Sequence, residues 1–97
     1  MGAGGVPNRT IERVDGRFGD LPSRGAKSNS RYDLYVNGER VQSRWFDNLG
    51  RVIRNRDYKH QDAHNNHFFP HDHQWDWGKG YPNRNPENLE PDYGKYN

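Results

Sequence analysis

Residues 32–46 read YDLYVNGERVQSRWF and give the strongest structural signal in the chain. Two runs rich in aromatic and β-branched residues flank Asn37-Gly38. This dipeptide is typical of a two-residue hairpin turn of the primed type, in which both central residues have positive φ. The sequence therefore predicts a β-hairpin with strands at 32–36 and 39–46.

A second turn follows at Asp47-Asn48-Leu49-Gly50, where Gly50 suits a left-handed bulge. Residues 51–58 then form a third strand, because aromatic and β-branched residues recur there between turn signals. We expect a three-stranded antiparallel meander to be the framework of the protein.

Alternation along these strands assigns each side chain to one face of the sheet. With Asn37-Gly38 as the turn, Leu34 lies opposite Val41, and the second turn places Ile53 against Trp45. One face is then apolar and consists of Tyr32, Leu34, Val41, Trp45 and Ile53. The other face collects Tyr35, Arg40, Gln42, Arg44, Arg54 and Arg56, with Phe46 and Val52 near the turn.

The predicted arginine face indicates an anionic partner. Arg44 would lie opposite Arg54, and like charges opposite one another cost stability unless an anion neutralises them. Most of the 15 basic residues are arginines, and guanidinium groups match phosphate geometry better than ammonium groups do. The alternative interpretation is a solvated face whose arginines point into water.

The flanks of the meander complete the expected fold. Residues 1–9 are glycine-rich and predict a flexible linker, and the opening Met1 and Gly2 suggest a piece of a longer polypeptide. A short helix is expected from Thr10, its N-cap, with Ile11, Val14 and Phe18 at helical spacing and Gly16 and Gly19 limiting its length. Residues 78–97 contain three of the chain's six prolines and predict an extended tail. The predicted fold class is α+β, with one domain at 10–97 and about four strands.

Composition limits the core and several chemistries. Apolar residues make up 29% of the 97, so the core is thin and its 13% aromatic residues must supply much of it. The absence of cysteine excludes disulfides, thiolate metal ligands and a cysteine nucleophile. No apolar run approaches the length of a membrane span and no signal-peptide core is present, so we expect no membrane association.

Residues 60–77 read HQDAHNNHFFPHDHQWDW and contain all five histidines. Residues 59–66 read as a loop, whereas His71, His73, Trp75 and Trp77 alternate with polar residues and predict a fourth strand with these four side chains on one face. Histidine serves both proton transfer and metal binding near neutral pH. The segment is therefore interpreted as an active site or a metal site.

Three chemistries compete for this segment. In metal-independent RNA cleavage, His71 and His73 act as general acid and base, Arg44 or Arg54 stabilises the charged phosphorane, and an aromatic ring stacks a base. In a metal nuclease of the HNH kind, the ligands come from Asp62, His64, His67, His71 and His73. In the third, histidines and aspartate hold a structural zinc ion without catalysis. For individual residues the alternatives are exposed loop histidines at 60 and 64, a packing role for His67, and tryptophans that form core.

The line YDLYVNGERVQSRWFDNLGRVIRNRDYKH followed by HFFPHDHQWDW resembles the C-terminal toxin domains of bacterial polymorphic toxins, of the RHS, contact-dependent and prophage types. The resemblance covers residues 28–77, and the segment from Trp45 to Val52 also looks like a YD-repeat unit of the shells that carry such toxins. Residue by residue it points to Asp57, Tyr58, His60, His71, His73, Trp75, Asp76 and Trp77. The sequence departs from the pattern at QDAHNN, where the family often has glycines.

The resemblance implies a metal-independent ribonuclease of the barnase, EndoU, colicin and RelE-like group. It also implies RNA as substrate, a cognate immunity protein, a larger carrier polypeptide, and secretion or delivery into the cytoplasm of a target bacterial cell. The predicted catalytic residues are His71 and His73, with His60 and His67 in reserve, and Asp57 and Asp76 orient them. The predicted substrate-binding residues are Arg40, Arg44, Arg54, Arg56, Tyr58 and Trp75.

No cofactor is expected in that case. The alternatives are a metal-dependent, HNH-like DNA nuclease and a non-enzymatic phage- or shell-associated binding module. In both, a divalent metal would be held by His64, His67, His71 and His73.

Overall fold

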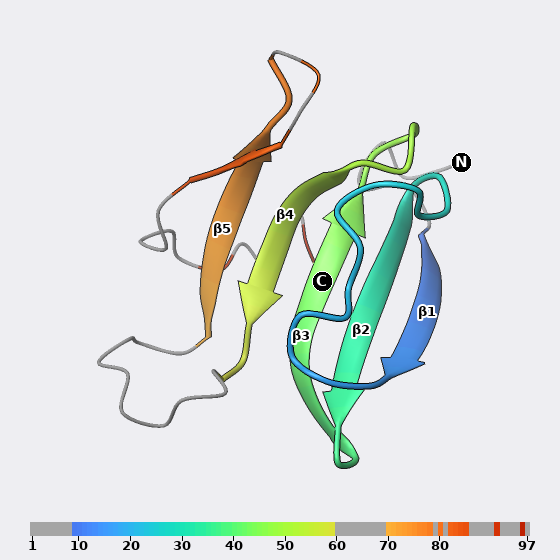
Figure 1. Ribbon diagram of the computed structural model, residues 1–97, viewed down its shortest axis with the longest axis vertical. Coiled ribbons are helices and arrows are strands. Elements are labelled where there is room, and N and C mark those ends of the chain that lie inside the picture. Colours follow the sequence, from blue (N-terminus) through green and yellow to red (C-terminus); the bar gives the residue numbers. More distant parts are fainter. Residues whose placement is uncertain are drawn as a thin grey trace.

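The computed structural model describes residues 9–59, 70–78, 80, 82–85, 91 and 96. The strands are β1 (Thr10–Asp15), β2 (Ser30–Val36), β3 (Glu39–Phe46), β4 (Val52–Asp57), β5 (His71–Asp76) and β6 (Asn83–Arg84). Within the described residues they form one six-stranded sheet in the order β1-β2-β3-β4-β5-β6 (Figure 1). Strands β1 and β2 are parallel and all other pairs are antiparallel. In the same residues no helix is long and apolar enough to span a membrane.

The predicted N-terminal helix is wrong, and with it the α+β class. Residues 10–15 form β1, which pairs in parallel with β2 from Thr10 opposite Ser30 to Asp15 opposite Tyr35. Thr10, Ile11 and Val14 are β-branched, and the six residues before Gly16 are too few for a stable isolated helix. The open edge of β2 supplies backbone hydrogen bonds for the whole segment, so pairing outweighs the helical spacing of the apolar residues. The described part of the chain contains strands and no helix.

The predicted count of about four strands is also wrong, because β1 and β6 extend the sheet at its two edges. The hairpin at its centre is confirmed. Asn37 and Gly38 have φ of 52° and 79°, which are the positive values that a primed turn requires. The predicted fourth strand is confirmed as β5, which pairs with β4.

The predicted turn at 47–50 is confirmed, and Gly50 is required there for two reasons. Its φ is 74°, a backbone conformation that residues other than glycine rarely adopt. A Cβ at this position would also collide with the backbone carbonyl of Ala26. The Gly50 N–H donates to the Asp47 carbonyl at 3.0 Å and closes the turn.

The predicted register is wrong at two β-bulges. Leu34 lies opposite Gln42 rather than Val41, because the register shifts between Leu34 and Tyr35. A second shift places Trp45 opposite Arg54 rather than Ile53. A slip of one residue exchanges the two faces of a strand. Tyr32, Leu34 and Val41 still pack together as predicted, but Trp45 lies on the other face. Gln42 and Arg44 are likewise separated from the other residues of the predicted arginine face.

The observed register gives two polar faces with a small apolar cluster. One face carries two rows of side chains that run across neighbouring strands: Leu34, Gln42, Asp57 and His71, and then Tyr32, Arg44, Asn55 and His73. The other face carries Asp33, Ser43, Arg56 and Asp72, and then Arg31, Trp45, Arg54 and Gln74. Arg44 and Arg54 therefore lie on opposite faces, and the predicted repulsion between them is absent.

Residues 16–29 connect β1 to β2 across the first of these faces, which we call the crossover face (Figure 1). Parallel strands need such a crossing because no tight turn can join them. Leu21 from this segment packs with Leu34 and Val41 in the buried apolar cluster. The segment is tied to the sheet by the Val52 N–H, which donates to the Ser23 carbonyl at 2.9 Å.

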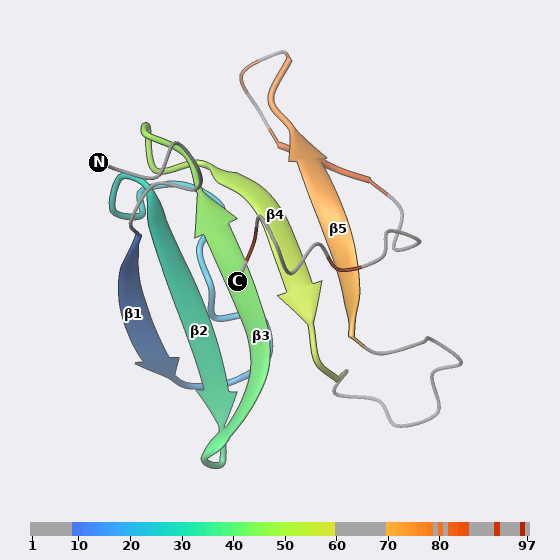
Figure 2. The same cartoon turned by 180° about the vertical axis from the view of Figure 1, so that it is seen from behind.

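The opposite face of the sheet is turned toward the viewer in Figure 2. A cluster of ion pairs fills this face. The Asp72 carboxylate is fully buried and accepts hydrogen bonds from Arg54 Nε at 2.7 Å and Arg56 Nε at 3.0 Å. The Arg56 guanidinium lies 5.1 Å from the Trp45 ring, and the ring of Tyr96 packs edge-on against Trp45. Paired charges and aromatic rings thus replace the aliphatic core that the sequence lacks.

Candidate functional site

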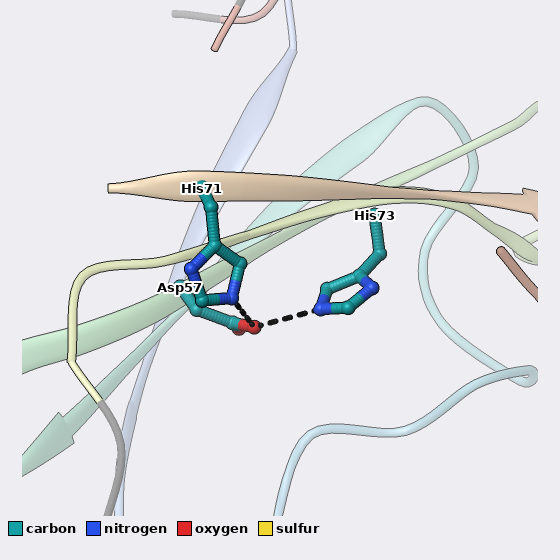
Figure 3. Close-up of side chains that lie close together, drawn as sticks. All are labelled: Asp57, His71 and His73. Atoms are coloured by element: carbon teal, nitrogen blue, oxygen red, sulfur yellow. Dashed lines mark ion pairs between the residues drawn. The ribbon is translucent and has the colours of Figure 1, made fainter. Parts of the chain in front are cut away.

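Asp57, His71 and His73 converge on the crossover face (Figure 3). Asp57 is the last residue of β4 and lies directly opposite His71, the first residue of β5. His73 is two residues further along β5 and therefore projects from the same face. The two imidazole Nε2 atoms lie 3.2 Å and 3.3 Å from one oxygen, Oδ2 of Asp57. Strand pairing thus assembles the site from residues that a loop separates in the sequence.

All three side chains are buried. The relative exposure is 4% for Asp57, 5% for His71 and 3% for His73. Buried carboxylates and imidazoles are costly unless their polar atoms are satisfied by partners. The cluster is therefore a built feature of the fold and not an incidental surface group.

Neighbouring amides fix the carboxylate of Asp57. Oδ1 accepts hydrogen bonds from Gln42 Nε2 at 2.7 Å and from Asn55 Nδ2 at 3.0 Å. The Asn55 side chain is held in turn by Trp75, whose indole N–H donates to Asn55 Oδ1 at 2.6 Å. Because both amides bind Oδ1, Oδ2 is the oxygen directed at the two imidazoles.

A backbone carbonyl fixes the tautomer of His73. Nδ1 lies 2.9 Å from the carbonyl oxygen of Asn85, which follows β6. A carbonyl can only accept, so Nδ1 carries a hydrogen and donates it. Nε2 of His73 makes no aligned hydrogen bond although it is buried and close to Asp57.

Burial and pairing act in opposite directions on this cluster. Burial raises the pKa of Asp57, but the contact with His73, the hydrogen bond from Gln42 and the positive charge on the imidazoles outweigh it, so the pKa lies below its ordinary value. Burial lowers the pKa of His73, but the Asp57 carboxylate and the Asn85 carbonyl outweigh it, so the pKa lies above its ordinary value. Each group therefore favours the charged form of the other.

Two arginines act on the same face. Arg44 donates to the carbonyls of Leu21 and Pro22 at 3.0 Å, and burial lowers its pKa. Its guanidinium attracts Asp57, and Arg84 of β6 repels both Arg44 and protonated His73. Arg84 is exposed, and this side chain, which we call the positively charged rim, adds a positive charge beside the buried cluster.

The predicted site residues are distributed between the two faces. His71, His73, Asp57, Arg44 and Trp75 lie together on the crossover face. The other predicted substrate-binding residues, which are Arg40, Arg54, Arg56 and Tyr58, belong to the opposite face, where Arg54 and Arg56 bind Asp72. Tyr58 contacts Ser43, and Arg40 lies over the Tyr58 ring at 4.5 Å.

Asp76 alternates with the histidines along β5 and accepts a hydrogen bond from the Asn85 side chain, away from both imidazoles. The remaining predicted residues lie outside the described part of the chain; they are His60, Asp62, His64 and His67. The structure therefore joins five of the predicted residues in one place and separates five others from them.

Four residues of the site were not anticipated from the sequence. Gln42 and Asn55 hold the carboxylate, Asn85 holds the imidazole, and Arg84 forms the positively charged rim. Gln42 and Asn55 are half-buried and buried amides inside strands. Because a buried amide needs a specific hydrogen-bond partner, such residues in a strand indicate a polar site nearby. The bulge in β3 concealed it, since without the bulge Gln42 is assigned to the arginine face.

Three donor atoms in this cluster can hold a metal ion. One ligand atom from each of Asp57, His71 and His73 lies within 4.8 Å of the others. Two imidazoles and one carboxylate form a frequent ligand set of catalytic metal sites, which leave further positions open. The alternative set predicted from the sequence shares only the two histidines of β5 with this group.

No family model, no curated protein and no solved structure matches this chain. The resemblance to polymorphic toxin domains therefore rests on the sequence motif alone.

Proposed function

We propose that this protein is an RNA-cleaving toxin domain whose reaction centre is the cluster of Asp57, His71 and His73. The observation that supports it is the convergence of two buried imidazoles on one carboxylate beneath a positively charged rim. Titratable groups with perturbed pKa values beside a cationic surface are typical of phosphoryl-transfer sites. The toxin-like motif at 70–77 supplies the centre's two histidines.

The proposed reaction is transesterification within RNA. The 2′-oxygen forms a bond to phosphorus while the bond from phosphorus to the 5′-oxygen breaks. The 2′-hydroxyl loses its proton to a base and the leaving 5′-oxygen gains one, which yields a 2′,3′-cyclic phosphate and a 5′-hydroxyl. Arg84 and Arg44, which both act electrostatically on the cluster, would stabilise the developing negative charge.

Trp75 favours a single-stranded substrate. Its side chain is half-buried beside the centre and its indole N–H is anchored on Asn55, which leaves part of the ring accessible. Exposed aromatic faces stack unpaired bases and are typical of single-stranded RNA recognition. The 2′-hydroxyl required by the reaction then restricts cleavage to RNA.

The role of His73 departs from free acid–base catalysis. Nδ1 is bound to Asn85 and Nε2 faces Asp57, so neither nitrogen is directed at solvent. His71 and His73 as independent acid and base would require the cluster to open when substrate binds. The second candidate, a metal-dependent nuclease acting on DNA, is favoured by the ligand set of the same three residues.

The test is cleavage of total RNA and of plasmid DNA by the purified protein, each with and without EDTA. Proteins to compare are the wild type, His73→Asn, and the control Asp15→Asn, which changes an exposed residue of β1. We expect RNA cleavage by the wild type and the control, and a loss of about 100-fold or more in His73→Asn, as for removal of a catalytic group. Cyclic phosphate termini identify the reaction.

Other outcomes are equally informative. DNA cleavage that requires metal would replace this proposal with the second candidate. A wild type that cleaves neither polymer would leave a binding module. In the toxin-domain proposal, a cognate immunity protein covers the positively charged rim, and a larger carrier delivers the domain into a target bacterial cell.

A further inference from the structure

We infer that Asp57 Oδ2, His71 Nε2 and His73 Nε2 bind one divalent transition-metal ion, and that zinc is the ion they fit best. The metal site rests on the geometry of these three side chains. The chemical role given to the ion below rests on the proposed function.

The spacing of the donor atoms fits a shared ion better than direct hydrogen bonds. The two imidazole nitrogens lie 3.2 Å and 3.3 Å from Asp57 Oδ2. Charge-assisted N–H···O bonds are shorter, about 2.7–2.9 Å. Two ligands at about 2.0–2.1 Å from a tetrahedral zinc ion are separated by about 3.3 Å. The observed distances therefore match two atoms coordinated to one ion.

The tautomer of His73 leads to the same conclusion. Its Nδ1 carries the hydrogen that is donated to the Asn85 carbonyl at 2.9 Å. If the ring is neutral, Nε2 presents a lone pair to the Asp57 oxygen, and two facing lone pairs repel, so either a proton or a metal cation must lie between the two atoms. Nε2 is buried and makes no aligned hydrogen bond. A cation between the two atoms removes the repulsion and satisfies both.

The surroundings already have the features of an outer coordination shell. Metal-binding histidines usually donate their other ring N–H to a carbonyl or carboxylate, and metal-binding carboxylates are themselves hydrogen-bonded. Asn85 provides the carbonyl for His73, and Gln42 and Asn55 bind the non-coordinating oxygen of Asp57. The shell fixes both donors before an ion arrives.

The donor set selects the class of ion. Two imidazole nitrogens with a single carboxylate suit zinc and its neighbours in the first transition row, whereas magnesium and calcium prefer oxygen ligands. Three protein ligands leave at least one coordination position for water or substrate, as in catalytic zinc sites. In the proposed reaction, a phosphate oxygen would take that position and the ion would stabilise the charge that develops on it, so that His71 and His73 would serve as ligands and not as acid and base.

The first experiment is calorimetric titration of the metal-free protein with zinc chloride, alongside Asp57→Asn and the control Asp15→Asn, which changes an exposed carboxylate on β1. We expect one ion per chain for the wild type and the control. Asp57→Asn should bind at least about 100-fold more weakly, since changes beyond the ligands already cost about 10–100-fold. Near-UV circular dichroism in EDTA reports whether each variant is folded.

A second variant and a second probe keep the inference falsifiable if Asp57→Asn does not fold. Gln42→Leu retains all three ligands and should weaken zinc binding by about 10–100-fold. Cobalt(II) titration should give the intense visible absorption of a tetrahedral site in the wild type and lose it in His73→Asn. Equal zinc affinity in the wild type and Asp57→Asn, or no binding by either, would overturn the inference.

Zinc binding and RNA cleavage can fail separately. A protein that binds one zinc ion at Asp57 but cleaves no RNA retains the metal site and loses the proposed function. A protein that binds no zinc but still cleaves RNA after chelation retains the proposed function and loses the metal site.

Discussion

Asp72→Asn is the most severe single test of the ion-pair cluster on the opposite face. The Asp72 carboxylate is 0% exposed and accepts three hydrogen bonds, from Arg54 Nε at 2.7 Å, Arg56 Nε at 3.0 Å and Arg56 Nη2 at 3.3 Å. The Arg56 side chain is 2% exposed and that of Arg54 is 12% exposed. Asparagine retains the size of the side chain and removes its charge.

The expected loss follows from the burial of both charges. Removing one partner of a buried ion pair typically costs about 3–5 kcal/mol, because the remaining charge stays in the interior. Because Arg54 is partly exposed, we expect a loss at the lower end of this range, about 3 kcal/mol. The total free energy of unfolding of a small domain is about 5–15 kcal/mol. With a urea dependence of about 1–3 kcal/mol/M, the unfolding midpoint should fall by about 1–3 M.

The assay is urea unfolding followed by tryptophan fluorescence, in EDTA so that bound metal does not contribute. Asp76→Asn is the control, because Asp76 is exposed on the same strand. Its midpoint should stay within about 0.5 kcal/mol of the wild type, as for other surface substitutions. A loss below about 1 kcal/mol in Asp72→Asn would refute the view that paired charges replace an aliphatic core here.

Three further predictions concern the turn, its pH dependence and the support of the site. Gly50→Ala should destabilise the protein by more than about 2 kcal/mol. Gly38→Ala should cost about 1 kcal/mol, because Gly38 also has a positive φ but no atom lies where the added Cβ would be. Equal losses of stability in thermal unfolding would contradict the clash with Ala26. Burial raises the pKa of Asp47, but backbone N–H groups and Arg51 outweigh it and hold the pKa below its ordinary value. The ionised carboxylate therefore stabilises the fold fully at pH values above the ordinary carboxyl pKa. The wild type should be more stable than Asp47→Asn there, and this difference in the free energy of unfolding should vanish as the pH falls through the lowered pKa. A difference that persists in acid would contradict this prediction. Trp75→Phe removes the hydrogen bond from the indole N–H to Asn55 and should weaken zinc binding by about 10–100-fold in calorimetry. An unchanged affinity would show that Asn55 holds Asp57 without this hydrogen bond.

The sequence predicts the local parts of the fold well. Asn37-Gly38 and the turn ending at Gly50 form as expected, because their backbone conformations depend on a few adjacent residues. The alternation of His71 and His73 correctly indicates β5. The alternation of the two histidines predicts the strand itself, although β5 still needs β4 as its partner.

Long-range pairing accounts for the wrong predictions. Thr10–Asp15 becomes a strand because β2 has an open edge, which nothing within the segment reveals. The bulge beside Val41 shifts β3 by one residue, so side chains predicted to share a face are separated. Intrinsic propensities are weak where tertiary contacts compete with them.

The site was predicted in pieces and assembled only by the structure. Asp57, His71 and His73 were each singled out, Asp57 as a residue that orients the histidines. Their meeting depends on the pairing of β4 with β5 across the segment between them, and the sequence does not specify that register. The carboxylate that converges with both imidazoles was consequently left out of the predicted metal ligands.

The most direct test of the account is a crystal structure of the protein grown with zinc, with diffraction data on both sides of the zinc absorption edge. We predict one strong anomalous peak about 2.0–2.2 Å from Asp57 Oδ2, His71 Nε2 and His73 Nε2. No peak at that position, with Nε2 of His73 instead in a short, aligned hydrogen bond to Asp57, would contradict the metal centre.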